Sequence, residues 1–142
     1  MNARSMRTTM LSLTAELVAA AAVLPASRAA GEDAGAVRPA FAAQLPNVPG
    51  KSLTAIVVSY APGGKSGKHH HAGSVFAYVL TGAIRSENSA TGPAKIYQAG
   101  ESFFEPPGSE HLVSENASET APASLLAVFI ADDGAQLTSF DR

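Results

Sequence analysis

Beyond residue 50, the apolar residues come in short runs that glycine, proline or asparagine residues close. The run Leu53–Tyr60 is rich in β-branched residues and is followed by Pro62-Gly63-Gly64, and the run Ser124–Ile130 is the most apolar. Short β-branched or aromatic runs bounded by turn residues are typical of strands. No stretch after residue 50 repeats its apolar residues every 3.6 positions, as an amphipathic helix would. The pattern therefore predicts an all-β sandwich or barrel.

The turn residues also predict where the strands end. Thr81-Gly82 separates two apolar runs and predicts a tight turn between paired strands. Pro106-Pro107-Gly108 closes another run. The expected strands are Leu53–Tyr60, Val75–Leu80, Ala83–Glu87, Lys95–Gln98, Ser102–Glu105, His111–Ser114, Ser124–Ile130 and Gln136–Phe140.

Length, charge and cysteine content exclude several classes of protein. The chain has 142 residues, which suits a single domain. It contains no cysteine, so disulfides, thiolate nucleophiles and cysteine zinc sites are excluded, and any metal must be held by imidazole or oxygen. The formal net charge is −2, and without a basic excess to neutralise phosphates we expect no nucleic-acid partner.

Residues 1–29 have the pattern of a secretory signal peptide. Two arginines give a positive start, a continuous apolar core runs from Leu17 to Leu24, and Ser27 and Ala29 are small residues at the two positions that a signal peptidase recognises. That core is far shorter than the roughly 20 residues that span a bilayer. We expect cleavage near Ala29 and a secreted or periplasmic mature protein with no membrane segment. An alanine-rich amphipathic helix is the alternative interpretation.

Residues 30–50 are rich in glycine, proline and alanine and show no sustained period, which predicts an extended N-terminal arm. Residues 51–142 then form the barrel domain. Because edge strands need covering and the arm is free to cross onto a neighbour, we expect a homodimer.

All histidines fall in two places. His69, His70 and His71 follow one another in one loop, and His111 stands alone after the Pro106-Pro107-Gly108 turn. In an extended chain, residues i and i+2 point to the same side, so His69 and His71 can aim at one point while His70 faces away. Three imidazoles suit zinc, copper, iron or nickel and leave coordination positions open. The alternative is a solvated polar loop, with His111 satisfied by a backbone carbonyl.

This arrangement resembles the cupin superfamily, a small antiparallel jelly-roll barrel with two motifs. The first motif is a glycine, five residues, His-x-His, three or four residues, a glutamate, six residues and a glycine. The second is a glycine, five residues, Pro-x-Gly, two residues, a histidine, three residues and an asparagine. The residues that fit are Gly63, His69, His71 and Gly82 in the first motif, and Gly100, Pro106, Gly108 and His111 in the second.

Two positions depart from the family pattern. The motif glutamate falls at Val75, so the resemblance implies a metal site of His69, His71 and His111 without that carboxylate. The motif asparagine falls at Glu115, one residue before Asn116. Glu105 and Glu110 lie near the second motif, and we interpret both as solvated surface charges rather than metal ligands. The sequence identifies no catalytic residue.

The resemblance implies a metal-dependent protein that acts on a small, oxygen-rich organic molecule inside the barrel. The expected cofactor is a divalent transition metal (Fe, Mn, Ni, Cu or Zn), and the expected chemistry is dioxygenase-like or that of an isomerase or lyase. Two alternatives stay open. One is a non-catalytic module that binds a small ligand or a sugar, and the other is a periplasmic metal-binding protein.

Overall fold

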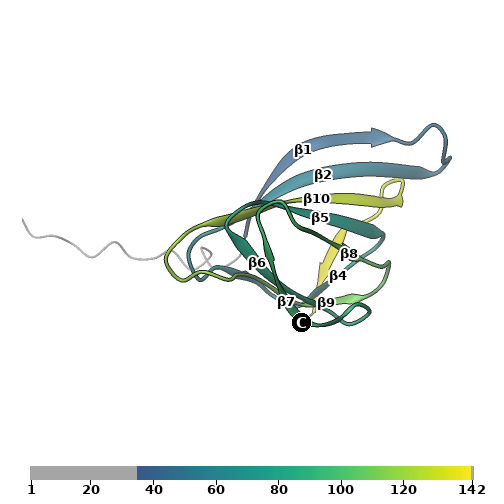
Figure 1. Cartoon of the computed structure of the whole chain (residues 1–142). Helices are drawn as coiled ribbons and strands as arrows, with labels where there is room; N and C mark the ends of the chain where they lie inside the picture. The colour runs from purple at the N-terminus through teal and green to yellow at the C-terminus, as the bar shows by residue number, and fades with distance from the viewer. Residues whose placement is uncertain (1–34, 142) are drawn as a thin grey trace, which may run out of the picture.

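The computed structural model describes residues 35–141, so the signal peptide expected over residues 1–29 lies outside the described residues. The described chain forms antiparallel strands in two sheets, which lie as layers around a shared interior (Figure 1). Within this part of the chain, no helix has the length and apolar character that a membrane crossing requires. The predicted all-β fold, an antiparallel jelly-roll barrel, is confirmed.

The first sheet has five strands in the order β1-β2-β10-β5-β8. The second sheet has six strands, with the path β11-β4-β9-β6-β7 and β3 paired to β9. Strands of the first sheet are β1 (Ala36–Gln44), β2 (Lys51–Tyr60), β5 (Ser74–Thr81), β8 (Ser102–Glu105) and β10 (Ala123–Asp132). Strands of the second sheet are β3 (Lys65–Ser66), β4 (His69–His71), β6 (Ala83–Asn88), β7 (Gly92–Gln98), β9 (Glu110–Asn116) and β11 (Thr138–Phe140).

Each strand predicted from a short apolar run is present, but one predicted turn is wrong. Thr81-Gly82 does not join paired strands, because β5 belongs to the first sheet and β6 to the second. Gly82 has a φ of +68°, and a Cβ on it would lie 2.7 Å from the carbonyl oxygen of Pro122. The glycine therefore forms a corner at which the chain leaves one layer and enters the other.

Within residues 30–50, where the sequence predicts an extended arm, residues 36–44 form the edge strand β1. This strand pairs antiparallel with β2, and the register shifts between Pro39 and Phe41. All of its residues are exposed, in contrast to the half-buried β2 next to it. β1 is therefore held to the barrel mainly by its ladder of backbone hydrogen bonds.

The core lies between the two sheets and follows the two-residue period of the strands. On β5, Val75, Ala77 and Val79 are buried, while the residues between them face outward. Burying a valine side chain contributes roughly 1.5–3 kcal/mol. The remaining core members are Tyr60, Ile84, Ala123, Leu125, Ala127 and Phe129.

Candidate metal centre

Three histidines from two adjacent strands meet inside the barrel. His69 and His71 lie on the short strand β4, which replaces the expected loop, and His111 lies on β9 directly opposite His69. All three side chains are buried. The ring centroid of His69 lies 4.8 Å from that of His71 and 4.9 Å from that of His111. As the alternation along an extended chain predicts, His70 is more exposed and faces away from the other two.

Backbone carbonyls orient two of these rings. The Nδ1 of His69 lies 2.7 Å from the carbonyl oxygen of Gly67. The Nδ1 of His71 lies 3.0 Å from the carbonyl oxygen of Leu137 and 3.1 Å from the hydroxyl oxygen of Thr138. Because a carbonyl can only accept, Nδ1 carries the proton in both rings. The unprotonated Nε2 of each ring is therefore the atom with a free lone pair.

Burial keeps these two histidines in the neutral form that a metal requires. Loss of solvation lowers the pKa of His69 and of His71 below the usual value of 6.5, although hydrogen bonds to backbone carbonyls partly oppose it. One nitrogen from each of His69, His71 and His111 can be chosen so that all lie within 4.8 Å of one another. Neutral, converging imidazoles are the donor set that first-row transition metals prefer.

Glu105 is also part of this cluster, and its interpretation as a solvated surface charge is wrong. The residue is 3% exposed. Its Oε2 lies 3.0 Å from His111 Nδ1 and 3.8 Å from His71 Nε2. Burial opposes ionisation, but the hydrogen bond from His111 and the positive charge that the three imidazoles carry when protonated together outweigh it, so the pKa of the Glu105 carboxyl lies below its usual range.

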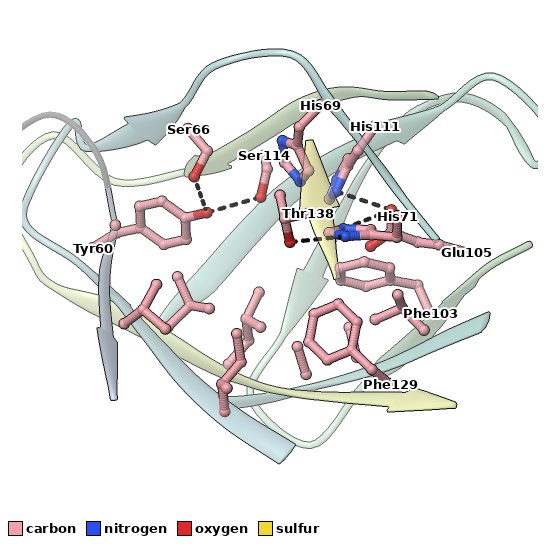
Figure 2. A pocket seen from close by; sticks show the side chains of 18 of the residues that line it. Tyr60, Ser66, His69, His71, Phe103, Glu105, His111, Ser114, Phe129 and Thr138 are labelled. Carbon is pink, nitrogen blue, oxygen red and sulfur yellow. Dashed lines mark hydrogen bonds and ion pairs between the residues drawn. The ribbon is translucent and has the colours of Figure 1, made fainter. Parts of the chain in front are cut away.

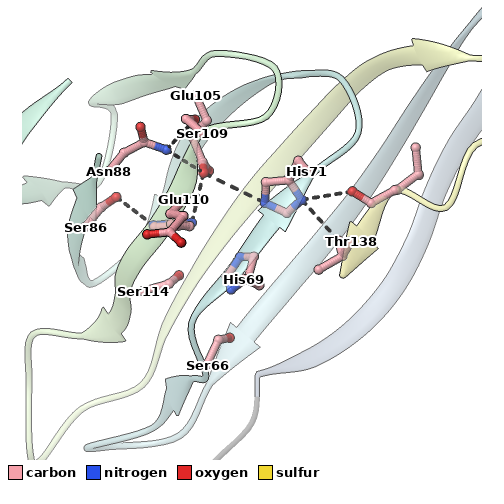
Figure 3. A network of polar contacts seen from close by, with 12 residues as sticks. Ser66, His69, His71, Ser86, Asn88, Glu105, Ser109, Glu110, Ser114 and Thr138 are labelled. Atoms are coloured by element: carbon pink, nitrogen blue, oxygen red, sulfur yellow. Dashed lines mark hydrogen bonds and ion pairs between the residues drawn. The ribbon is translucent and has the colours of Figure 1, made fainter. Parts of the chain in front are cut away.

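Further polar side chains contact Glu105 and His111; Figure 3 shows Ser86, Asn88 and Ser109 on the side of Glu105. The hydroxyl of Ser86 lies 2.9 Å from His111 Nε2. The side-chain amide of Asn88 donates to Glu105 Oε2 at 3.3 Å and to the hydroxyl oxygen of Ser109 at 2.9 Å. Both Ser86 and Asn88 are buried, on the inner face of β6. Partners of this kind fix the orientation of ligand side chains.

A cavity of about 120 Å³ opens beside the histidines. Figure 2 shows the histidines and Glu105 at one end and Tyr60 at the other, with Phe103 and Phe129 below. The Tyr60 hydroxyl forms hydrogen bonds with Ser66 at 2.8 Å and with Ser114 at 2.9 Å. Burial raises the pKa of Tyr60, so this phenol stays protonated near neutral pH. The other wall is apolar and includes Ile56, Val58, Val75, Ala77, Leu125 and Ala127.

Two residues near the motifs stay outside the centre. His70 Nδ1 lies 3.7 Å from a carboxylate oxygen of Asp141, and both side chains are exposed. Glu110 is exposed and lies 3.9 Å from the amine of Lys68, which agrees with its interpretation as a surface charge. Glu110 and His111 are neighbours in β9 and therefore point to opposite faces.

Sequence reasoning missed Glu105, Ser86 and Asn88. One local signal was available for Glu105, because Phe103 and Glu105 are two residues apart and share a face of β8. Nothing local shows which face of so short a strand is the inner one. Ser86 and Asn88 are placed by the pairing of β6 with β9, which is a long-range contact.

Solved structures share this fold. An oxalate oxidase matches with a TM-score of 0.60 and 20% identity, over 85% of this chain and 62% of that one. The DMSP lyase DddQ from Ruegeria pomeroyi DSS-3 matches with a TM-score of 0.59 and 19% identity, over 80% of this chain and 54% of that one. The chain therefore spans less than two thirds of either protein, and identities this low show the fold alone.

A third structure is an uncharacterised protein with a double-stranded β-helix domain from Klebsiella pneumoniae. It matches with a TM-score of 0.52 and 21% identity, over 63% of this chain and 75% of that one. Among curated proteins, no significant sequence match was found. The family model for the cupin domain matches residues 56–129, which include both histidine motifs and more than half of the chain. The chain therefore belongs to the cupin family.

Proposed function

We propose that this cupin holds a divalent transition metal at His69, His71 and His111 and acts on a small, oxygen-rich organic molecule in the adjoining cavity. The observation that carries the proposal is the set of three buried imidazoles on one inner face, two of which have Nε2 free. Histidine is seldom fully buried for packing alone, and here three buried imidazoles converge beside a buried carboxylate. The donor set fits the metal that the fold implies.

The residues around the cavity determine what it accepts. A volume of about 120 Å³ is comparable to that of an apolar cavity of about 150 Å³ that binds benzene. This size favours a substrate of a few carbon atoms. One wall of the cavity is apolar, and the Tyr60 hydroxyl, held by Ser66 and Ser114, offers a neutral polar contact at the far end.

The metal, when bound, would polarise an oxygen atom of the substrate and stabilise negative charge on it. The protein's own residues orient the histidine rings through Gly67 and Leu137 and keep them unprotonated by burial. Solved structures of this fold include enzymes named for oxalate, a small dicarboxylate. They support a small organic acid as the class of substrate, with oxidase or lyase chemistry.

Metal analysis of the purified protein tests the first half of the proposal. We expect near-stoichiometric Fe, Mn, Ni, Cu or Zn in the wild type, and loss of that metal in His69→Ala, His71→Ala and His111→Ala. His70→Ala is the matched control, because His70 lies between two of these residues but faces outward. Equal metal content in all the variants would contradict the proposal.

Turnover tests the second half. Metal-loaded protein should transform a member of a panel of 2-hydroxy acids, small dicarboxylates and small diketones, followed by oxygen consumption and by chromatography of products. Binding of a panel member without turnover would instead support the non-catalytic ligand-binding alternative. Metal binding without either effect would support a metal-binding protein.

We also propose that the chain forms a homodimer through its N-terminal arm. β1 exposes Val37 and Phe41, each about 60% accessible, at the outer edge of the first sheet. A partner that covers this strand would bury these apolar side chains. Light scattering should give twice the mass of one chain, and a monomeric mass at working concentration would contradict the proposal.

Export remains a proposal that rests on the sequence of residues 1–29. We infer that the protein is secreted or periplasmic after cleavage near Ala29. Intact-mass measurement on protein recovered from the periplasm or the medium should show loss of this segment. Recovery of the uncleaved chain in the cytoplasmic fraction alone would contradict it.

A further inference from the structure

Glu105 lies directly across from the position at which the family pattern has its glutamate. The motif glutamate position is occupied by Val75, which is 1% exposed and faces the cavity. In the pairing of β5 with β8, the residue directly opposite Val75 is Glu105. Directly opposed residues of an antiparallel pair have Cβ atoms about 4.5–5.5 Å apart and share a face of the sheet. A carboxylate at position 105 therefore reaches the same space as one at position 75.

The carboxylate of Glu105 lies close enough to two of the histidines to share a metal with them. Donor atoms bound to one metal at about 2.1 Å lie roughly 3.0–3.4 Å apart in neighbouring positions. Glu105 Oε2 lies 3.0 Å from His111 Nδ1, which is within this range, and 3.8 Å from His71 Nε2, which is somewhat longer. In addition, three neutral imidazoles leave both charges of a divalent ion uncompensated in a buried site, and one carboxylate reduces that excess.

The orientation of Glu105 is also supported by Asn88, which lies opposite His111 in the pairing of β6 with β9. Asn88 donates to the same oxygen, Oε2, and also to Ser109. The hydroxyl of Ser109 donates to the carbonyl oxygen of Pro106, the residue after Glu105, at 2.7 Å. These contacts link the carboxylate to the turn that leads into β9 and His111. These contacts therefore fix the position of Glu105 relative to His111.

We propose that Glu105 is the fourth protein ligand of the metal, and that the carboxylate function of this family has moved from position 75 to the facing position in the neighbouring strand. This inference rests on the three-histidine centre proposed above. It places Asn88 as a positioning residue, which acts on the metal only through Glu105. His111 would bind through Nδ1, with its Nε2–H then donating to Ser86.

The test uses the full chain, Co²⁺ as the probe, and competition against a chromophoric chelator to measure affinity. Glu105→Gln keeps the shape of the side chain and removes its charge. We expect it to weaken Co²⁺ binding by about 100-fold or more, since even changes to groups behind a ligand cost 10- to 100-fold, and to change the visible Co²⁺ absorption bands. Glu110→Gln, an exposed glutamate of the same region, is the matched control and should bind like the wild type.

A double variant tests the exchange of positions itself. Val75→Glu combined with Glu105→Val returns the carboxylate to the family position, and should recover Co²⁺ affinity to within about 10-fold of the wild type. Glu105→Asp, which shortens the side chain in place, should give an affinity between those of the wild type and Glu105→Gln, and keeps the proposal testable if the double variant does not fold.

The possible outcomes separate this inference from the proposed function. Wild-type affinity and an unchanged Co²⁺ spectrum in Glu105→Gln would overturn the role of Glu105 and leave the three-histidine centre intact. A wild-type chain that binds no Co²⁺ would overturn the proposed function and this inference together.

Discussion

Replacement of Phe129 by alanine tests whether the apolar floor beneath the histidines supports the fold. Phe129 on β10 is 2% exposed, and its ring meets that of His71 edge-on with 5.1 Å between the centroids. A buried phenylalanine removes about 200 Å² from water, which at about 25 cal/mol per Å² corresponds to roughly 5 kcal/mol. Measured costs of such truncations are about 3–5 kcal/mol.

We therefore expect Phe129→Ala to lower the free energy of unfolding by about 4 kcal/mol, out of the roughly 5–15 kcal/mol that a domain has. The assay is urea unfolding followed by far-ultraviolet circular dichroism, in the presence of a chelator so that bound metal does not contribute. The chain has no tryptophan, so fluorescence is a weaker probe. Phe129→Leu conserves most of the volume and should cost less than about 1.5 kcal/mol.

Phe104→Ala is the matched control, because Phe104 is 50% exposed and faces outward from β8. Its truncation should cost at most about 2 kcal/mol, since half of the ring already lies in water and no cavity forms. A loss in the free energy of unfolding that is no larger for Phe129→Ala than for Phe104→Ala would show that burial of Phe129 does not stabilise the fold as expected.

Three more predictions concern the centre and its supports. Burial lowers the pKa of His69 and His71, so below about pH 6.5 the unfolded chain binds more protons than the folded chain. Urea titrations of the metal-free protein should therefore show that the free energy of unfolding falls as the pH drops, by at most about 1.4 kcal/mol per pH unit for each histidine. A free energy of unfolding that does not change with pH would contradict this. Thr138→Val removes one of two acceptors at His71 Nδ1 and should weaken Co²⁺ binding by about 10-fold at most, whereas no change would show that the Leu137 carbonyl suffices. Gly73→Ala places a Cβ against the Ile130 carbonyl oxygen and should lower the thermal midpoint by several degrees; an unchanged midpoint would argue against that close approach.

The strands, and the placement of two of the three histidines on one face, follow from local sequence. The side-chain period of an extended chain is two, so the spacing of His69 and His71 by itself places them on one face. The apolar runs bounded by glycine and proline predict the strands for the same reason, since burial of one face and the chemistry of turns are both local properties. The second motif brings in His111 only through the family resemblance.

Long-range pairing decided the remaining features. The chain changes sheets at Gly82 because Pro122 and the strand that follows it occupy the neighbouring space, and no local pattern distinguishes such a corner from a hairpin. Glu105 is buried because β8 pairs with β5 in a register that sets it opposite Val75. A glutamate directly before a Pro-Pro-Gly turn looks solvated in sequence, and only its neighbours across the sheet make it part of the centre.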